Sequence, residues 1–188
     1  MSTTIIVGDG PGSLSAAMFL AKNGHQVTVI GDDKTAVHFA QLKNYLGIDD
    51  MGGTEFHQIA REQAAAAGAD LTDGRVTALT RGEKGFLAMT DDGPAHSADY
   101  VILNEGRKPE LATALGLDTD ESGAIAVDAN QRSSLDGVYV IGRSVRPNRS
   151  QVIISAGAGA VAAVDILSRE AGQDVQDWDA PPKDDRGS

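Results

Sequence analysis

The chain opens with a strand-like pattern, a helical pattern and a second strand-like pattern within about 30 residues. Thr3–Val7 is a short β-branched apolar run that ends in a cluster of glycines. Apolar residues then recur at helical spacing between Leu14 and Ala21, and Asn23-Gly24 closes the helix. Gln26–Ile30 is a second buried run. This order predicts one βαβ unit, whose crossover is expected to be right-handed.

The rest of the chain shows two more helical stretches and several short strand-like runs. An apolar stripe predicts a helix from Thr54, its expected N-cap, to Ala67, with Gly68 after its end. A helix with a face of small residues is predicted from Gln151 to Glu170. Residues 32–53 predict a loop with one helical turn, and the polar residues 172–188 predict a disordered tail. Strands are predicted at Ala69–Leu71, Arg75–Thr80, Gly85–Thr90, Tyr100–Leu103, Ala124–Val127 and Val138–Ile141, the second and third as an antiparallel hairpin.

Charge and composition narrow the functional classes. The 188 residues include 27 acidic and 16 basic side chains, for a formal net charge of −11. So acidic a chain repels phosphate backbones, and no nucleic-acid partner is expected. The sequence contains no cysteine, which excludes disulfides and cysteine-ligated metals within it. No apolar run approaches the roughly 20 residues of a membrane span, and no basic segment precedes the first apolar run. We therefore expect no membrane association, no signal peptide and a cytoplasmic location.

A glycine motif joins the first predicted strand to the first helix. Gly8, Gly10 and Gly12 fit the dinucleotide-binding pattern G-x-G-x-x-G, with Ser13 at its last position. The glycines permit a tight turn and let a diphosphate approach the backbone at the N-terminus of the helix. The alternative is a plain glycine turn in an α/β protein. The candidate diphosphate-binding residues are Gly8, Gly10, Pro11, Gly12 and Ser13.

Other side chains give weaker signals. The acid that binds the adenosine ribose is expected at the end of the second strand, where Gly31 stands, and Asp32 or Asp33 is the candidate in its place. A solvated turn is the alternative for this pair. The four histidines show no metal-ligand spacing, so no metal site is expected, and His25 and His57 are interpreted as surface or capping residues. No hydrolase elbow is present, and no catalytic residue is identified.

Four stretches in order resemble the FAD domain of thioredoxin-reductase-like flavoproteins. They are the glycine turn with its Gly10-Pro11 step, the segment Asn44–Ile48 with the helix that follows, the strand at 98–103 with Asn104-Glu105-Gly106 after it, and the strand 138–141 with Gly142 and the helix from Gln151. Together they cover most of the chain. The resemblance implies an α/β, Rossmann-like, three-layer FAD-binding fold with a central parallel sheet and a smaller antiparallel β-meander.

The resemblance also implies a domain organisation, a cofactor and a site. Residues 1–171 are expected to form a single FAD-binding domain. The family's NADPH-binding domain, which carries its Cys-x-x-Cys pair, is missing between Leu103 and Leu135, so disulfide reduction by the usual mechanism is excluded. The implied contacts to FAD, beyond the glycine motif and the two aspartates, are Asn44, Val76, Asn104, Gly106, Gly142, Arg143, Gln151 and Val152.

Departures from the family pattern fall at three of its cofactor contacts. Arg143 stands where the family has a ribitol-binding Asp, Gly31 where it has the ribose Glu, and Ser150 where it has an Arg. Arg143 lies in a run with Arg146 and Arg149, which we interpret either as a docking patch for an anion beside the flavin or as a solvated loop. Tyr45 or Phe39 either stacks on the flavin or belongs to the core.

Two functions remain open at this stage. The first is an FAD-dependent oxidoreductase-like flavoprotein that takes electrons from a separate donor or reductase, or acts on a small-molecule substrate. The second is a non-catalytic adenine-dinucleotide-binding module or partner subunit derived from such a domain. Relatives of this kind commonly form dimers through the FAD domain, so a homodimer is expected.

Overall fold

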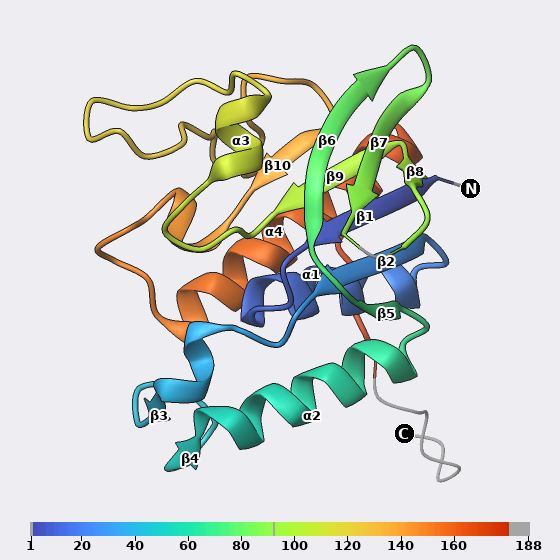
Figure 1. The fold of residues 1–188 in the computed structure, drawn as a ribbon. Helices are drawn as coiled ribbons and strands as arrows, with labels where there is room; N and C mark the ends of the chain where they lie inside the picture. Colours follow the sequence, from blue (N-terminus) through green and yellow to red (C-terminus); the bar gives the residue numbers. More distant parts are fainter. Residues whose placement is uncertain (1, 92, 181–188) are drawn as a thin grey trace, which may run out of the picture.

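A five-stranded parallel sheet forms the centre of the molecule, in the order β10-β9-β1-β2-β5 (Figure 1). The computed structural model describes residues 2–91 and 93–180. In register, Val7 pairs with Ile30 on one side and with Leu103 on the other, so the carboxyl ends of the three central strands meet at one edge. The strands are β1 (Thr3–Val7), β2 (Gln26–Gly31), β5 (Asp70–Asp73), β9 (Tyr100–Leu103) and β10 (Val138–Val140).

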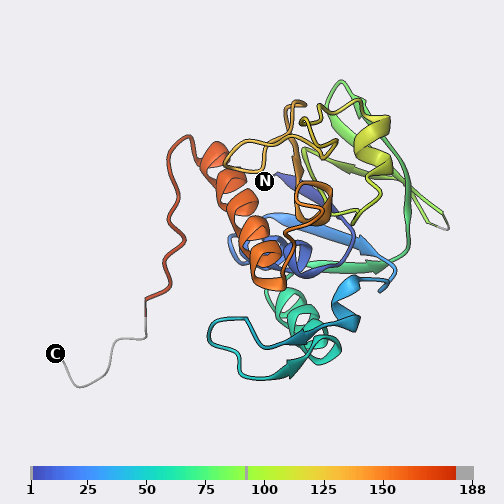
Figure 2. The ribbon, with the colours of Figure 1, turned by 90° about the vertical axis from the view of Figure 1, so that its left-hand side faces the viewer.

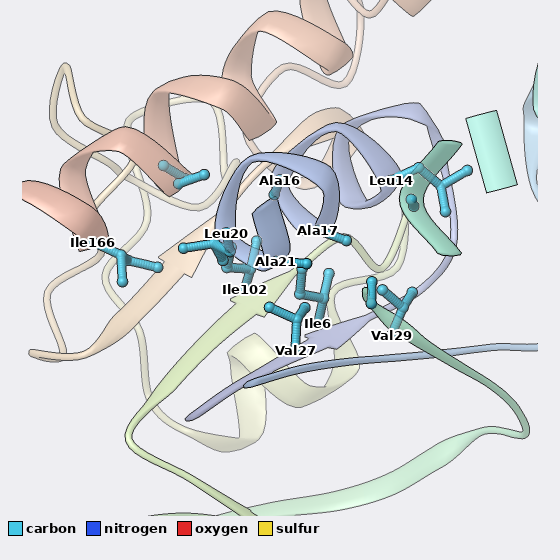
Figure 3. Packing of buried hydrophobic residues seen from close by; sticks show 14 of the residues in the cluster. Ile6, Leu14, Ala16, Ala17, Leu20, Ala21, Val27, Val29, Ile102 and Ile166 are labelled. Atoms are coloured by element: carbon cyan, nitrogen blue, oxygen red, sulfur yellow. The ribbon is translucent and has the colours of Figure 1, made fainter. Parts of the chain in front are cut away.

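Three helices cover one face of this sheet. They are α1 (Pro11–Lys22), α2 (Gly53–Ala66) and α4 (Val152–Ala171). Alternate strand residues such as Ile6, Val29 and Ile102 point toward them and pack with Leu14 and Leu20 (Figure 3). This alternation is the strand period of two, and it places every second apolar side chain under the helices.

The other face of the sheet is covered by an antiparallel β-meander and a short helix. The remaining alternate residues, among them Ile5, Val7 and Val101, pack with Phe86 and Leu111 of this layer. Seen from the side in Figure 2, α4 and the β-meander lie on opposite sides of the sheet. The three-layer α/β architecture is therefore confirmed. The layer consists of β6 (Val76–Gly82), β7 (Gly85–Thr90), β8 (His96–Ala98) and α3 (Glu110–Ala114).

Helices α1 and α4 approach each other unusually closely. A β-carbon on Gly159 would collide with the Gly12 carbonyl oxygen, and a β-carbon on Gly12 would lie 2.7 Å from the Ser155 carbonyl oxygen. The small residues on both helices make this contact possible. By length and composition, α4 is the one helix among the described residues that would suffice to cross a membrane. Its small-residue face is buried against α1, which is typical of a core helix.

A hydrogen-bonded ion pair anchors the C-terminal half of α4. Arg132 donates from Nε and Nη2 to the Asp165 carboxylate over 2.7 and 2.6 Å, and the Tyr139 hydroxyl donates to the same carboxylate over 2.6 Å. Burial acts to raise the pKa of Asp165, but these donors outweigh burial and hold that pKa below its usual value. The pair connects α4 to the edge strand β10.

Several predicted elements differ from those observed. Residues 124–127 do not form a strand; Ile125 makes only an isolated bridge, because the Asp120 carboxylate accepts from the Ala124 amide and holds the segment in a turn. Helix α2 starts one residue before Thr54, with Gly52 as its N-cap. The patterns did not predict α3 or β8. Residues 32–53 contain the expected turn as η1 (Ala36–Phe39), together with the two-residue strands β3 (Gln41–Leu42) and β4 (Met51–Gly52).

The predicted tail is described only as far as residue 180. Helix α4 ends at Ala171 with Gly172 as its C-cap, and residues 174–180 have no regular secondary structure. Val175 packs against the helical core, and Lys22 pairs with Asp177 over 3.1 Å. Residues 181–188 lie outside the described residues.

Candidate functional site

A large cavity lies at the carboxyl edge of the central sheet. Its volume is about 1220 Å³, above the usual size of a drug-like pocket and enough for an extended dinucleotide. The turns after β1, β2 and β9 bound it, and β6 and the N-terminus of α4 complete it. This is the position at which open α/β sheets bind ligands.

The turn after β1 is held open by Gly8. Its φ is +85°, a conformation that favours glycine, and a β-carbon there would lie 2.5 Å from the Asn104 carbonyl oxygen. The Gly8 amide donates to the carbonyl of Ile30 over 2.8 Å, which fixes the turn on β2. Gly8, Gly10 and Pro11 line the cavity, and the two glycines contribute only backbone to its wall.

Two helix N-termini open into this cavity without a side-chain cap. Gly10 is the N-cap of α1 and Gln151 is the N-cap of α4; neither makes a side-chain capping bond, and neither helix has an acid in its first turn. Gly10, Pro11, Gln151 and Val152 all line the cavity. Uncapped N–H groups and the positive ends of both helix dipoles are therefore available to an anionic ligand.

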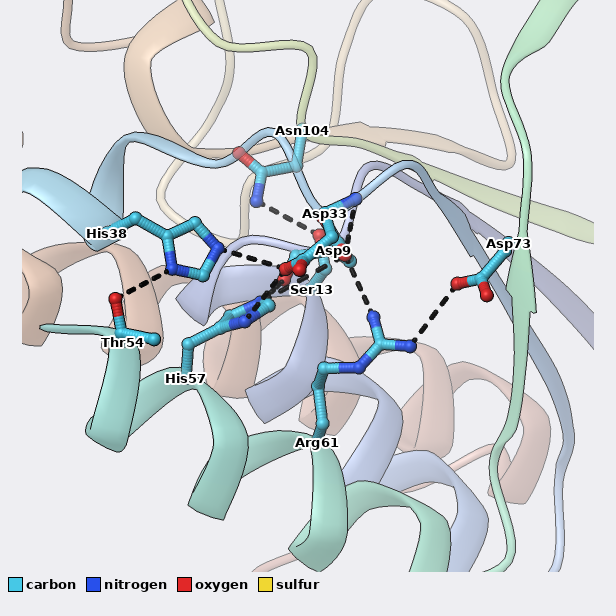
Figure 4. Close-up of polar contacts among 9 residues, drawn as sticks. All are labelled: Asp9, Ser13, Asp33, His38, Thr54, His57, Arg61, Asp73 and Asn104. Atoms are coloured by element: carbon cyan, nitrogen blue, oxygen red, sulfur yellow. Dashed lines mark hydrogen bonds and ion pairs between the residues drawn. The ribbon is translucent and has the colours of Figure 1, made fainter.

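The side chain of Asn104 explains one departure in the glycine motif. Its Nδ2 donates to the Ser13 hydroxyl over 2.9 Å, so the serine at the last motif position has a partner (Figure 4). The Asn104 amide also lies against Gly10 and Gly142, where a β-carbon on either residue would meet it. Ser13 thus stands in place of the last glycine of the motif, and its hydroxyl is held by the hydrogen bond from Asn104.

Asp9 explains the glycine at the ribose position. A β-carbon on Gly31 would lie 2.6 Å from the Asp9 Cβ, so the aspartate fills the space that a side chain at residue 31 would need. The Asp9 carboxylate is buried and accepts from Arg61 Nη1 over 2.9 Å and from the Asp33 amide over 3.2 Å. The Asp9 carboxylate therefore lies beside the end of β2, although Asp9 itself belongs to the glycine turn after β1.

Charged side chains line the rest of the cavity. Asp32 faces it and pairs with Lys34 over 2.8 Å, and that ammonium holds the pKa of Asp32 below its usual value. The carboxylate of Glu105 accepts from the Leu111 and Ala112 amides and so caps α3. Burial raises the pKa of Glu105 despite these bonds. The basic lining residues are Lys34, Arg75, Arg107, Lys108 and Arg143.

Most of the predicted cofactor contacts line the cavity, and five do not. Gly12 and Gly142 are buried behind its wall, and Ser13 is bonded to Asn104. Asn44 reaches the rim only through Gln151, to whose Oε1 it donates over 3.1 Å. Asp33 points to the other side of the glycine turn, which leaves Asp32 as the member of the pair in the cavity. The predicted residues that line it are Gly8, Gly10, Pro11, Asp32, Val76, Asn104, Gly106, Arg143, Gln151 and Val152.

Some lining residues were not predicted. Lys34 directly follows Asp33, and Arg75 directly precedes Val76. Adjacency in sequence to these predicted contacts was the one signal that could have identified them. Of the aromatic candidates, Tyr45 packs on Phe56 with ring centroids 5.6 Å apart, and Phe39 is exposed. Neither lines the cavity.

The histidine spacing predicted no cluster, but two of the four histidines meet in the structure. The rings of His38 and His57 meet edge to face, with centroids 4.9 Å apart, and Asp33 lies between them (Figure 4). His57 is only 2% exposed, so it is not the surface residue predicted from its place in the first turns of α2. No spacing along the chain marks this cluster, because its members come from three separate elements.

Comparison with known proteins agrees with this geometry. A family model described as pyridine nucleotide-disulphide oxidoreductase matches residues 47–160, more than half of the chain. A thioredoxin reductase from Peptoclostridium litorale is 27% identical over 166 residues, which are 85% of this chain and 49% of that protein. A dihydrolipoyl dehydrogenase from Haloferax volcanii is 25% identical over 182 residues, 92% of this chain and 36% of that protein.

Solved structures show the same fold. A thioredoxin reductase from Gloeobacter violaceus superposes with a TM-score of 0.85 at 15% identity, over 96% of this chain and 99% of that one. The atypical thioredoxin reductase TRi from Desulfovibrio vulgaris Hildenborough gives a TM-score of 0.81 at 18% identity, over 92% and 99%. By sequence, the chain spans between about a third and a half of the curated relatives it matches.

Proposed function

Because the chain belongs to the pyridine nucleotide-disulphide oxidoreductase family, whose members bind FAD, we propose that it is an FAD-binding flavoprotein that exchanges electrons with a separate donor. The observation that carries the proposal is the pair of uncapped helix N-termini opening on one cavity of about 1220 Å³. The residues present fit the cofactor, because the turn has room for a diphosphate only while residues 8 and 10 are glycines. A β-carbon on Gly8 or Gly10 would lie 2.5 or 3.0 Å from atoms of Asn104.

Each end of the cavity has a distinct task in this proposal. The amides of Asp9 and Gly10 in the glycine turn and the N-terminus of α1 bind the diphosphate. Asp32 and the backbone of Val76 face the adenosine end. When bound, the flavin supplies reversible electron transfer. The N-terminus of α4, at Gln151, stabilises negative charge that develops at its end of the cavity on reduction.

The segment between β9 and β10 supports the proposal of a separate donor. Residues 104–137 contain only the five-residue helix α3 and irregular turns, with no βαβ unit to bind a nicotinamide cofactor. None of the 188 residues is a cysteine, so no cysteine pair within them relays electrons to a disulfide. In this proposal, electrons enter and leave through partners that reach the cavity.

A ligand comparison tests the proposal. The purified protein is expected to show flavin absorbance, and after removal of bound nucleotide its melting temperature is expected to rise with FAD more than with FMN, NADPH or ADP. Stabilisation by ADP as strong as by FAD, with a colourless protein, would instead establish an adenine-nucleotide module without redox function. No stabilisation by any of the four ligands contradicts both functions.

A further inference from the structure

Three possible metal ligands converge on the side of the glycine turn that faces away from the cavity. Asp33 Oδ1 lies 2.9 Å from His38 Nε2 and 3.3 Å from His57 Nδ1, and the three atoms lie within 4.8 Å of one another (Figure 4). The loop after β2, the short helix η1 and helix α2 supply one residue each. None of the three lines the cavity.

The outer nitrogen of each histidine already has a partner. His57 Nε2 lies 2.8 Å from the carbonyl oxygen of Asp9, which can only accept, so this nitrogen carries the proton in the neutral ring. His38 Nδ1 lies 3.1 Å from the Thr54 hydroxyl, which we assign as its acceptor. Both inner nitrogens then direct lone pairs toward the Asp33 carboxylate. Metal-bound histidines are held in this way, by a carbonyl or hydroxyl at the far nitrogen.

The distances between these atoms suit one metal ion. For metal–ligand bonds of about 2.1 Å, neighbouring ligands lie roughly 3.4 Å apart in a tetrahedral site and roughly 3.0 Å apart in an octahedral one. The two contacts of Asp33 Oδ1, at 2.9 and 3.3 Å, are close to these values. The two histidine nitrogens lie within 4.8 Å of each other, so a metal ion can reach both with small side-chain movements.

The surroundings fix Asp33 and leave the site accessible. Asp33 adopts a φ of +56°, and its amide donates to the Asp9 carboxylate. Arg61 neutralises that second carboxylate, so the cluster itself carries one negative charge. The His57 side chain is buried, whereas 61% of the Asp33 side chain is exposed, and water can complete the coordination.

We propose that Asp33, His38 and His57 bind a divalent first-row transition metal ion, with Zn²⁺ as the probe. Two imidazoles and one carboxylate favour Zn²⁺, Co²⁺ or Ni²⁺ over Mg²⁺ and Ca²⁺, which prefer oxygen ligands. The ion ties η1 and α2 to the backbone of the glycine turn through Asp9. The site does not depend on the proposed function, because none of its ligands contacts the cavity.

Calorimetric titration with zinc tests the site. Full-length protein, treated with a chelator and free of any polyhistidine tag, is expected to bind about one equivalent of Zn²⁺ at micromolar concentrations. Millimolar Mg²⁺ is expected not to compete. The substitutions Asp33→Asn and His38→Ala are expected to weaken binding at least tenfold, and Thr54→Val several-fold. Both ligand substitutions are at residues that are not fully buried, so they avoid disrupting the core at His57.

Matched substitutions and a spectroscopic readout keep the proposal falsifiable. Asp32→Asn, one residue away, and His96→Ala, on β8, are expected to bind zinc as the unmodified chain does. Cobalt is expected to give visible bands in the unmodified chain that are lost in His38→Ala. The proposal is overturned if zinc binding is not saturable, or if it is equal in Asp33→Asn, His38→Ala and the two matched variants. Absence of binding would mean that protons, not a metal ion, link Asp33 to its histidines.

Discussion

The two sides of the glycine turn after β1 are built in different ways. On the cavity side, the turn and the two helix N-termini present main-chain amides, and charged side chains line the cavity beside them. On the other side, Asp33, His38 and His57 present side-chain atoms from three elements. A site made of backbone tolerates substitution as long as the chain path is kept, whereas a site made of side chains is lost with one truncation. Asp9 belongs to both sides: it lines the cavity, and on the other side its carbonyl oxygen contacts His57 and its carboxylate accepts from Arg61.

The largest expected effect comes from breaking the chain path on the cavity side. Gly8→Ala places a β-carbon 2.5 Å from the Asn104 carbonyl oxygen at a φ of +85°. We expect FAD affinity to fall more than 100-fold and stability to fall by about 2–4 kcal/mol. Absorbance titration with FAD and urea unfolding measure the two effects.

Gly24→Ala is the control for backbone strain alone. Gly24 has nearly the same φ, +83°, but no atom within 4 Å of its added β-carbon. It is expected to cost about 1 kcal/mol and to leave FAD affinity unchanged. Equal FAD affinity in the two variants would contradict the role given to the close approach at Gly8.

A substitution remote from both sides separates stability from binding. Asp165→Asn removes the carboxylate that accepts from Arg132 and Tyr139, and we expect a loss of about 2–3 kcal/mol at pH 7. Because the folded state lowers the pKa of Asp165, the stabilisation is complete above its unfolded pKa of about 3.9 and is lost as the pH falls through the lower folded value. Urea unfolding at pH 7 and below pH 4 measures this deficit, which is expected to shrink in acid.

Binding in this variant provides the other half of the test. At 25 °C and pH 7 the folded protein is expected to keep its affinity for FAD and for zinc, since neither site contacts Asp165. A weakened affinity for either ligand would show that the corresponding site responds to global stability.

The smallest effect is expected where a side chain on the cavity side is truncated. Gln151→Ala removes an exposed side chain that accepts only from Asn44, while the amides of α4 keep their positions. FAD affinity is expected to change less than about threefold, against the loss of at least tenfold in zinc affinity for His38→Ala. A large effect of Gln151→Ala on the FAD titration would mean that side chains also form this end of the cavity.

The difference between a site built from backbone and one built from side chains also explains which features could be predicted from the sequence. The βαβ unit and the glycine turn were predictable from local sequence. Gly8 must adopt a positive φ close to Asn104, and this requirement is visible in the sequence as closely spaced glycines between a strand and a helix. The helix from Gln151 was predictable from its stripe of small residues. The position of the Asp9 side chain beside Gly31 was not, because it depends on a space that only the paired strands define. His38 and His57 lie 19 positions apart without a motif, and only the packing of η1 against α2 brings them together.

The contact between α1 and α4 also has a consequence for synthesis. Gly12 meets Gly159, so α1 packs against a helix that lies 147 positions further along the chain. Until α4 emerges from the ribosome, the face of α1 that contacts α4 stays uncovered, because only the early strands and α2 can pack against α1 before then. During that interval the nascent protein exposes an apolar surface that chaperones can recognise.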